Sequence, residues 1–371
     1  MSDSILSIHI NTELSWRGGE QQTFSLVEGL TGRGHPAVLV ASPRSEIFRR
    51  ARTAGIEAVG IHAYNEVDPQ AFLRIAALLR RRRPDILHLH TSHGHLLGVL
   101  ASALAPPVKK VVARRVDFSI YRNSFLGLNG FKYRHGIDRY ITVSQAVADL
   151  LVRDGVAPER VSVVRSGINP GRFASVRPEG GSQLRRELGL PEGLPLISSV
   201  GALADHKGHR FLVEASPTVL REVDAAFVIA GIGPRRRALQ RLIRRLGVSG
   251  RVRLAGFRED IGEILAASAV FVFPSIEEGL GTSILDALIL DRPVVATRAG
   301  GIPEIIEDRR HGLLVPPGDA SALAAAITEV LRRPSMASEL AQRGKSRVLA
   351  EFTADRMVEE TMMVYRDVLG S

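Results

Sequence analysis

Short apolar runs rich in valine and isoleucine alternate along the chain with longer segments in which apolar residues recur every three or four positions. Runs of the first kind predict buried strands, and segments of the second kind predict helices with one face on a sheet. The helix around Phe72, Ile75 and Leu79 is an example, because this spacing places the three side chains on one face. Such alternation is typical of parallel sheets built from strand–helix–strand units, so we predict an α/β fold.

The predicted strands fall into two series. The first comprises residues 5–10, 37–41, 58–61, 86–90, 108–113, 140–143 and 161–164. The second comprises residues 196–200, 226–230, 252–254, 270–274, 294–297 and 313–315. Residues 169–195 between them are rich in glycine, proline and charge, which is typical of a linker. We therefore predict two domains, 1–168 and 196–354, a division that also suits a chain of 371 residues.

The composition narrows the class of protein. Hydrophobic residues make up 45% and charged residues 24%, as in ordinary globular proteins. The chain has no cysteine, which excludes disulfides, thiolate metal ligands and a cysteine nucleophile. It contains neither an apolar run long enough to span a membrane nor a recognisable signal peptide, so we expect it in the cytoplasm.

The net charge of +10 attracts anionic partners of several kinds. The densest basic cluster, Arg80 to Arg83, ends a predicted helix, where cations are favoured by the helix dipole. Either a solvated helix end or a contact with an anionic membrane at the inner face of the plasma membrane fits this cluster. Aromatic residues make up only 5% and none interleaves with the basic clusters, so we expect no nucleic acid partner.

Ligands of a parallel sheet bind beyond the carboxyl ends of its strands, so the loops that follow the predicted strands carry the candidate chemistry. Glycine lets the backbone of such a loop approach a phosphate closely. The glycine-rich loops are Trp16-Arg17-Gly18-Gly19-Glu20, the run from Gly201 to Gly208, and Gly231-Ile232-Gly233-Pro234. In the second of them Lys207 is a candidate cation for a diphosphate. Taken singly, each loop is explained equally well as a plain turn, and the lysine as a solvated side chain.

The loop from Pro274 to Ser283 is the most informative. Its carboxylate Glu278 suits sugar hydroxyls, while the free amides of Thr282 and Ser283 open a predicted helix and suit phosphate oxygens. Asp286 follows about one turn further along that helix, where it suits ribose hydroxyls. Acidic residues near a helix start also serve as caps and dipole partners, so this alternative stays open for each carboxylate.

Together, these loops resemble the retaining family 4 glycosyltransferases, whose fold is called GT-B. The resemblance runs over essentially the whole chain. Its most specific part lies between Pro274 and Glu304, where a glutamate is followed by seven residues and a second acidic residue, here Glu278 and Asp286. Supporting matches are Gly18-Gly19, the run from Asp85 to His90, Val143-Ser144, the run from Arg165 to Ile168, and Lys207-Gly208.

The resemblance implies two Rossmann-like, doubly wound parallel-sheet domains that face each other across a cleft. It implies that residues 169–195 are a hinge and that the final helix, 355–371, packs back on the first domain. By the same carry-over, Lys207 meets the diphosphate, Glu278 the transferred sugar and Asp286 the ribose. The donor-binding residues that the resemblance predicts are Arg17, Gly18, Gly19, Lys207, Gly233, Phe257, Glu278, Gly281, Thr282, Ser283 and Asp286.

The implied reaction is retaining transfer of a sugar from a nucleotide-diphosphate sugar, with no metal or other cofactor. The expected acceptor is a glycan or lipid-linked glycan of the cell envelope, held mainly by the first domain. Such a step requires stabilisation of negative charge on the leaving diphosphate, which fixed amides and cations provide. The sequence marks no pair of carboxylates on the two faces of a sugar, as double displacement would require.

Three positions depart from the family pattern. Ala202 replaces an arginine that usually pairs with the lysine on the diphosphate, and Arg17, His206 and Arg115 are candidate replacements. The second acidic residue is Asp286 rather than glutamate. The run from Ala113 to Asp117 lacks the histidine that many members place near the transferred sugar. We therefore predict Glu278, Lys207 and Arg115 as catalytic residues and His90 and Asp117 as acceptor-side residues, while Arg115 and Asp117 also suit a structural pair.

Alternate histidines at 88, 90, 93 and 95 could suggest a metal site, but a carboxylate ligand would be expected nearby, and we predict no metal. Two other functions compete with transfer. One is a nucleotide-sugar epimerase or sugar phosphorylase on a similar fold. The other is a catalytically degenerate subunit that binds nucleotide sugar, which the missing arginine and histidine suggest.

Overall fold

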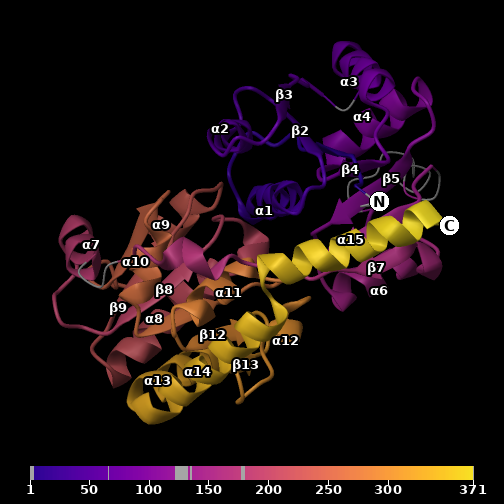
Figure 1. The fold of residues 1–371 in the computed structure, drawn as a ribbon. Coiled ribbons are helices and arrows are strands. Elements are labelled where there is room, and N and C mark those ends of the chain that lie inside the picture. Colours follow the sequence, from indigo (N-terminus) through magenta and orange to yellow (C-terminus); the bar gives the residue numbers. More distant parts are fainter. Residues whose placement is uncertain (1–3, 66, 122–132, 134–135, 177–179, 371) are drawn as a thin grey trace. The chain divides into compact units, whose positions relative to one another are not determined.

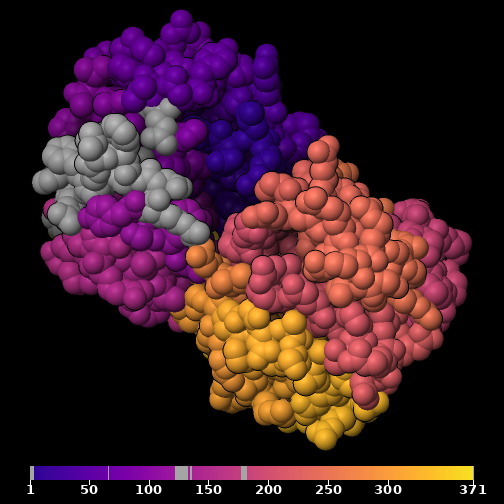
Figure 2. All heavy atoms as spheres, turned by 180° about the vertical axis from the view of Figure 1, so that it is seen from behind, coloured from indigo at the N-terminus to yellow at the C-terminus, as the bar shows by residue number. Residues whose placement is uncertain are grey.

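The computed structural model describes residues 4–65, 67–121, 133, 136–176 and 180–370; the remaining residues are drawn in grey in Figure 1 and Figure 2. The chain divides into two compact units. Unit 1 comprises Met1–Asn169 together with Ala354–Ser371, and unit 2 comprises Pro170–Thr353. Each unit is built around its own parallel sheet.

Unit 1 contains a sheet of seven parallel strands among the described residues, in the order β3-β2-β1-β4-β5-β6-β7. The strands are β1 (Ser7–Ile10), β2 (Ala37–Ala41), β3 (Ala58–Gly60), β4 (Ile86–Leu89), β5 (Lys109–Arg114), β6 (Arg139–Thr142) and β7 (Val161–Val163). The chain order reverses beside β1 and β4, the position where a doubly wound sheet opens a crevice for ligands. Most residues of β1, β2 and β4 are buried, as expected for strands covered on both faces.

Helices cover both faces of this sheet, as Figure 1 shows. One face is covered by α1 (Gly18–Gly32), α2 (Glu46–Thr53) and the C-terminal helix α15 (Ala354–Gly370). The other is covered by α3 (Pro69–Arg82), α4 (Ser92–Ala103) and α6 (Gln145–Arg153). The 3₁₀ helix η2 (Pro158–Arg160) precedes β7. On the first face, Met357, Val358 and Tyr365 of α15 pack with Leu26 and Leu30 of α1, which fixes the last helix of the chain to unit 1.

Unit 2 contains six parallel strands among its described residues, in the order β10-β9-β8-β11-β12-β13. The strands are β8 (Leu196–Val200), β9 (Ala226–Ala230), β10 (Val252–Gly256), β11 (Val270–Phe273), β12 (Val294–Thr297) and β13 (Leu313–Val315). Here the order reverses beside β8 and β11. The loops that follow these two strands are therefore the ones that a ligand of unit 2 would meet first.

The helices of unit 2 also form two layers. The larger hydrophobic cluster packs α8 (His209–Glu222), α9 (Arg236–Arg245), α13 (Ala320–Arg332) and α14 (Pro334–Glu351) on one face. In Figure 2 the orange to yellow surface of α13 and α14 adjoins that of α8, in line with their packing. A smaller cluster joins α7 (Gly180–Leu188) and α10 (Ile261–Ala266) to the other face. The remaining helices are η3 (Pro170–Phe173), η4 (Asp205–Lys207), α11 (Thr282–Ile289) and α12 (Ile302–Ile305).

The predicted α/β fold with two Rossmann-like parallel sheets is confirmed, and each predicted strand matches a strand to within two residues at either end. The segment predicted as a separate linker, 169–195, differs from that prediction. From Pro170 onward it belongs to unit 2, where Leu184 and Leu190 are buried against β8 and β9. Its glycines, prolines and charges masked these apolar positions. The hinge role of this segment stays a prediction.

Candidate active site

The Lys207 loop, which follows β8, is fixed against the loop that follows β11. Gly208 has φ +63°, and a Cβ at this position would collide with the carbonyl oxygen of Pro274. The Ile276 amide donates a hydrogen bond of 2.7 Å to the His206 carbonyl. Only glycine combines this left-handed backbone with so close an approach, so the Lys207-Gly208 pair has a structural reason in addition to its charge.

Lys207 and Glu278 form an ion pair in which Lys207 Nζ lies 2.5 Å from Glu278 Oε2. Ser275 Oγ donates to the same carboxylate oxygen at 3.2 Å. The side chains of the lysine and the glutamate are only 20% and 12% exposed, and the lysine also lies 5.5 Å from the centre of the Phe273 ring. The structure therefore brings together the residue predicted for the diphosphate and the residue predicted for the transferred sugar.

Helix α11 begins directly after this ion pair. Gly281 precedes the helix with φ +96°, and a Cβ there would lie 3.6 Å from Glu278 Cγ. Thr282 and Ser283 are half-buried and form the first turn, where backbone amides have no partner within the helix. A helix start of this kind suits an anion such as a diphosphate.

Asp286 lies on the same helix and is almost completely buried, at 8% exposure. Burial raises its pKa from 3.8 to about 6, against the opposing effect of Arg172. Arg172 Nη1 donates a hydrogen bond to Asp286 Oδ1 at 3.1 Å. Sequence reasoning missed Arg172, because it stands in the segment predicted as a linker and belongs to no motif that the sequence marked.

Two further predicted residues lie at the same edge of the unit 2 sheet, in loops that follow β9 and β10. A Cβ at Gly233 would lie 2.5 Å from the carbonyl oxygen of Leu203, so the loop after β9 is in close contact with the loop after β8. Phe257 is 57% exposed and is the most accessible aromatic group in these loops. Ala202, which replaces the usual arginine, is half-buried between the loops. Their roles toward a nucleotide stay predictions.

The predicted residues of unit 1 cluster where α1 begins. Arg115 Cδ would lie 3.8 Å from a Cβ at Gly19. The backbone amide of Arg17 donates to the Glu20 carboxylate at 3.1 Å. Burial raises the pKa of Glu20, partly opposed by Arg115, and burial lowers the pKa of Arg115 to about 10. The guanidinium of Arg115 contacts both the carbonyl oxygen and Nδ1 of His90, at 3.3 and 3.0 Å.

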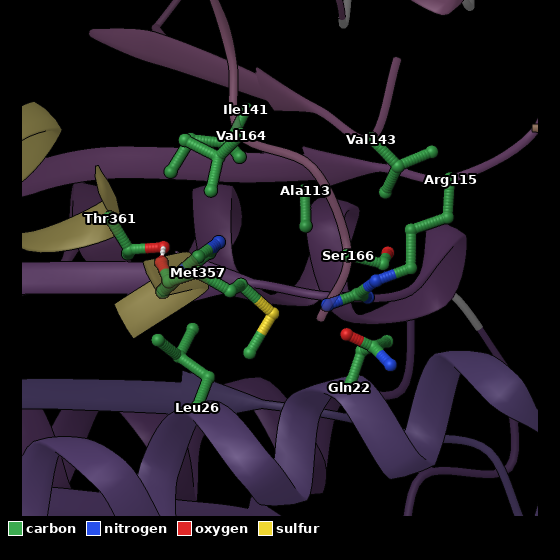
Figure 3. Close-up of a pocket in the computed structure, with 11 residues that line it drawn as sticks. Gln22, Leu26, Ala113, Arg115, Ile141, Val143, Val164, Ser166, Met357 and Thr361 are labelled. Atoms are coloured by element: carbon green, nitrogen blue, oxygen red, sulfur yellow. Dashed lines mark hydrogen bonds between the residues drawn. The ribbon is translucent and has the colours of Figure 1, made fainter. Parts of the chain in front are cut away.

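Behind Arg115 lies a small cavity of about 20 Å³. Figure 3 shows the Arg115 side chain reaching toward Gln22 and Ser166, with Thr361 and Met357 of α15 at the opposite end. His88 also lines this cavity, and its Nε2 has no partner among the described residues. The space holds about one water molecule and is too small for a sugar. The predicted contacts of Arg115, His90 and the half-buried Asp117 with substrate are not tested by this cavity.

Three histidines of unit 1 come together, but they are not the four that alternate in the sequence. Nitrogens of His9, His88 and His90 lie within 4.8 Å of one another, and His9 on β1 was missed because its neighbours are distant in sequence. His9 Nδ1 lies 3.0 Å from His90 Nε2, and the rings of His88 and His90 stack with centres 4.1 Å apart. Burial lowers the pKa of all three, so they are neutral at pH 7.

This histidine cluster is an internal hydrogen-bond chain rather than a good cation site. Stacked rings do not direct their lone pairs at one point, and the Arg115 guanidinium beside His90 repels a metal ion. Ser7 Oγ binds the remaining nitrogen of His9, and the Tyr365 hydroxyl binds His88 Nδ1 at 2.6 Å. The absence of a metal cofactor stays a prediction.

Comparison with known proteins identifies the family. Residues 16–172 match the family model described as Glycosyltransferase Family 4, and residues 195–333 match the model described as Glycosyl transferases group 1. The chain is 30% identical over 307 residues to the alpha-maltose-1-phosphate synthase of Mycolicibacterium smegmatis, across 76% of this chain and 79% of that protein. The chain belongs to the family 4 glycosyltransferases.

Other glycosyltransferases are also similar over most of this family 4 member. The lipopolysaccharide core biosynthesis glycosyltransferase LpsE of Rhizobium meliloti is 29% identical over 289 residues, across 77% of each protein. The crystal structure of Anabaena HepE in complex with UDP and glucose has a TM-score of 0.86 at 19% identity, covering 98% of this chain and 100% of that one. The predicted GT-B fold is thereby confirmed. Among the described residues, none of the helices is both long and apolar enough to cross a membrane.

Proposed function

We propose that this family 4 glycosyltransferase moves a sugar from a nucleotide-diphosphate sugar to a glycan or lipid-linked glycan, with retention of anomeric configuration and without a metal ion. The observation that carries the donor assignment is the Lys207–Glu278 ion pair directly before the N-terminus of α11. It combines a cation from the loop after β8 with a carboxylate and the first-turn amides of α11 from the segment after β11. These are the groups that a sugar diphosphate requires.

In this proposal the diphosphate replaces Glu278 as the partner of Lys207 and accepts hydrogen bonds from the amides of Thr282 and Ser283. Glu278 is then free of the lysine and accepts hydrogen bonds from hydroxyl groups of the transferred sugar. Negative charge that develops on the leaving diphosphate then meets groups already fixed in place, which lowers the barrier without reorganisation. The Lys207 ammonium supplies the charge for which a metal would otherwise be needed. Gly19 of unit 1 acts toward the phosphate, as the family resemblance implies, and Arg115 is the candidate replacement for the histidine that many members place near the transferred sugar.

The relatives support the substrate class. One of the similar structures is a complex with UDP and glucose, and one relative is a lipopolysaccharide core biosynthesis glycosyltransferase. The first supports a donor with a nucleoside diphosphate, and the second supports an acceptor of the cell envelope.

The decisive experiment is thermal unfolding with a panel of nucleoside diphosphates and nucleotide sugars carrying uridine, guanosine, adenosine, cytidine or thymidine. A ligand that binds only the folded protein raises the melting temperature. We expect one base to give a selective shift and the matching nucleotide sugar to be turned over with acceptor, the product keeping the anomeric configuration by NMR. Binding without turnover would support the noncatalytic subunit, and no binding at all would exclude the donor proposal.

We further propose that helix α3 meets an anionic membrane that carries the acceptor. Leu73 on this helix is 52% exposed, and Tyr64 and Val67 in the preceding loop are 85% and 58% exposed. Arg80 and Arg81 are exposed on the same helix, and neither forms an ion pair with an acidic group in the part of the chain that the structure describes. Exposed apolar groups next to arginines are typical of surfaces that bind anionic lipid.

Flotation with vesicles tests this surface. The chain should bind vesicles containing phosphatidylglycerol more strongly than vesicles of phosphatidylcholine alone, with the difference reduced by salt. The double variant Tyr64→Ser and Leu73→Ser should lose binding. Leu349→Ser is the matched control, because Leu349 on α14 is 47% exposed but lies outside this surface. Equal binding by both variants would reject the assignment to α3.

A further inference from the structure

A contact within unit 2 joins the start of that unit to the buried carboxylate of α11. Arg172 lies in η3, and its Nη1 donates to Asp286 Oδ1 at 3.1 Å. The guanidinium also lies over the Phe173 ring, 4.6 Å from its centre, which limits its rotation. Its side chain is 33% exposed and that of Asp286 is 11% exposed, so the arginine is the accessible member of the pair.

The two oxygens of the Asp286 carboxylate differ in their contacts. Oδ1 accepts the hydrogen bond from Arg172, whereas Oδ2 accepts none from the residues that the structure describes. Oδ2 keeps some exposure to solvent, because the fully buried side-chain atoms without a hydrogen-bond partner in the described chain do not include it. An accessible acceptor in an otherwise buried carboxylate is available to a hydroxyl group of a ligand.

Arg172 is the charged group that acts on this carboxyl among the described residues. The elements packed against α11 are α10, α14, β11 and β12. Strands β11 and β12 carry no ionisable side chain. On α14, Lys345 pairs with Asp291 and Arg347 with Glu351. Burial and Arg172, rather than Glu263 of α10, account for the shift of the Asp286 pKa.

We propose that Arg172 is a positioning residue that holds the Asp286 carboxylate through Oδ1 and thereby presents Oδ2 to a ribose hydroxyl of the donor. This inference rests on the proposed function, which assigns the ribose to Asp286. Aspartate is one methylene shorter than the glutamate of the family pattern, so its carboxylate has less reach and depends more on being fixed in place. Arg172 supplies that fixation from outside the motif.

The effect of the Arg172 charge on Asp286 also supports a positioning role for the arginine. Burial drives the Asp286 pKa up to about 6, and the Arg172 charge opposes this rise. Without the guanidinium, a larger fraction of the carboxyl would be protonated near neutral pH. A protonated group is a weaker acceptor, so loss of Arg172 should weaken the ribose contact most just above pH 6, where the wild-type carboxyl is ionised and that of the variant is still largely protonated. The difference should shrink at high pH, where both are ionised, and at low pH, where both are protonated.

The test is a thermodynamic cycle in which one hydroxyl group is removed from the ligand and the Arg172 side chain is replaced, singly and together. Isothermal titration calorimetry compares the nucleoside diphosphate that stabilises the wild type with its 2′-deoxy and 3′-deoxy forms, from pH 5 to 8. We expect the wild type to bind one deoxy form about 10-fold more weakly, as for a lost hydrogen bond to a charged acceptor. Arg172→Gln should reduce this ratio to below about 3-fold, and Arg172→Lys should restore part of it.

The same titrations give the pH readout. The binding midpoint of the wild type should lie near pH 6, the value that the Asp286 pKa sets, and that of Arg172→Gln should move to higher pH. Arg343→Gln is the matched control, because Arg343 pairs with Glu339 on α14 and should change neither readout. Arg172 is partly exposed, so both of its variants are expected to fold, which the melting temperature checks.

Each outcome bears on a different statement. An unchanged deoxy ratio in Arg172→Gln, with affinity lowered equally at every pH, would mean that Arg172 contacts the ligand directly and would overturn the positioning role. Equal affinity of the wild type for ribo and deoxy forms would overturn the inference but leave the donor proposal intact. Failure of the wild type to bind any nucleoside diphosphate would instead reject the proposed function.

Discussion

Lys207 Nζ and Glu278 Oε2 lie 2.5 Å apart, in loops that are 71 positions apart in the sequence. Each of the two residues predicted to meet opposite ends of a sugar diphosphate is therefore the partner of the other in the structure. A partly buried ion pair of this kind compensates two charges that would be costly to bury singly. A diphosphate must compete with the Glu278 carboxylate for Lys207.

From this competition we expect opposite effects on binding of the free nucleoside diphosphate. Lys207→Ala removes a charged donor and should weaken binding by about 10- to 100-fold. Glu278→Gln removes the competing charge and should leave binding unchanged or tighter, while turnover of the nucleotide sugar falls by at least about 10-fold. Calorimetry gives the affinities and a coupled assay for released diphosphate gives the rates. Equal loss of affinity in both variants would contradict this exchange of partners.

Gly208 should be required for the position of Lys207. Gly208→Ala introduces a Cβ that would collide with the Pro274 carbonyl oxygen, and it should weaken nucleotide binding as well as lower the melting temperature. Gly247→Ala is the matched control: its φ is +69° against +63° at Gly208, but nothing lies within 4 Å of the added Cβ. The control should cost only the left-handed backbone penalty of about 1–2 kcal/mol. Similar effects of the two variants would show that the contact with Pro274 is unimportant.

The strands of both sheets could be predicted from the sequence, because parallel strands covered on two faces appear as short runs of valine and isoleucine. The boundary of unit 2 could not. Leu184 and Leu190 lie among charges and glycines, so their burial against β8 and β9 has no periodic signal. Burial there results from tertiary packing, which local composition does not encode.

The candidate site was predictable as far as its residues follow strands within a motif. Lys207 and Glu278 follow β8 and β11, adjacent strands at the point where the sheet order reverses, so parallel topology alone brings their loops together. Arg172 and His9 were missed, because their partners Asp286 and His90 are distant in sequence and no spacing rule connects them.

A chelator should leave the enzyme unaffected. Among the three histidines of unit 1 whose nitrogens approach within 4.8 Å, His9 is hydrogen-bonded to His90, and His90 contacts Arg115, a cation that disfavours a metal ion. Dialysis against EDTA should therefore change neither the melting temperature nor the rate of sugar transfer, and added Zn²⁺ should not stabilise the protein. A fall in melting temperature with EDTA that Zn²⁺ reverses would establish a metal at these histidines.

Asp286→Asn should raise stability at neutral pH while it weakens nucleotide binding. The pKa of Asp286 rises from 3.8 to about 6 in the folded protein, so protonation favours the folded state. Protonation of Asp286 therefore adds to the free energy of unfolding. This contribution is complete below pH 3.8 and is lost as the pH rises through 6, and it amounts to about 3 kcal/mol. Asparagine does not titrate and should not show this loss. Urea unfolding should therefore give the variant and the wild type similar stability at pH 4 and a more stable variant at pH 7.5. A stability difference that is the same at both pH values would mean that the Asp286 carboxylate is ionised at little cost in the folded protein.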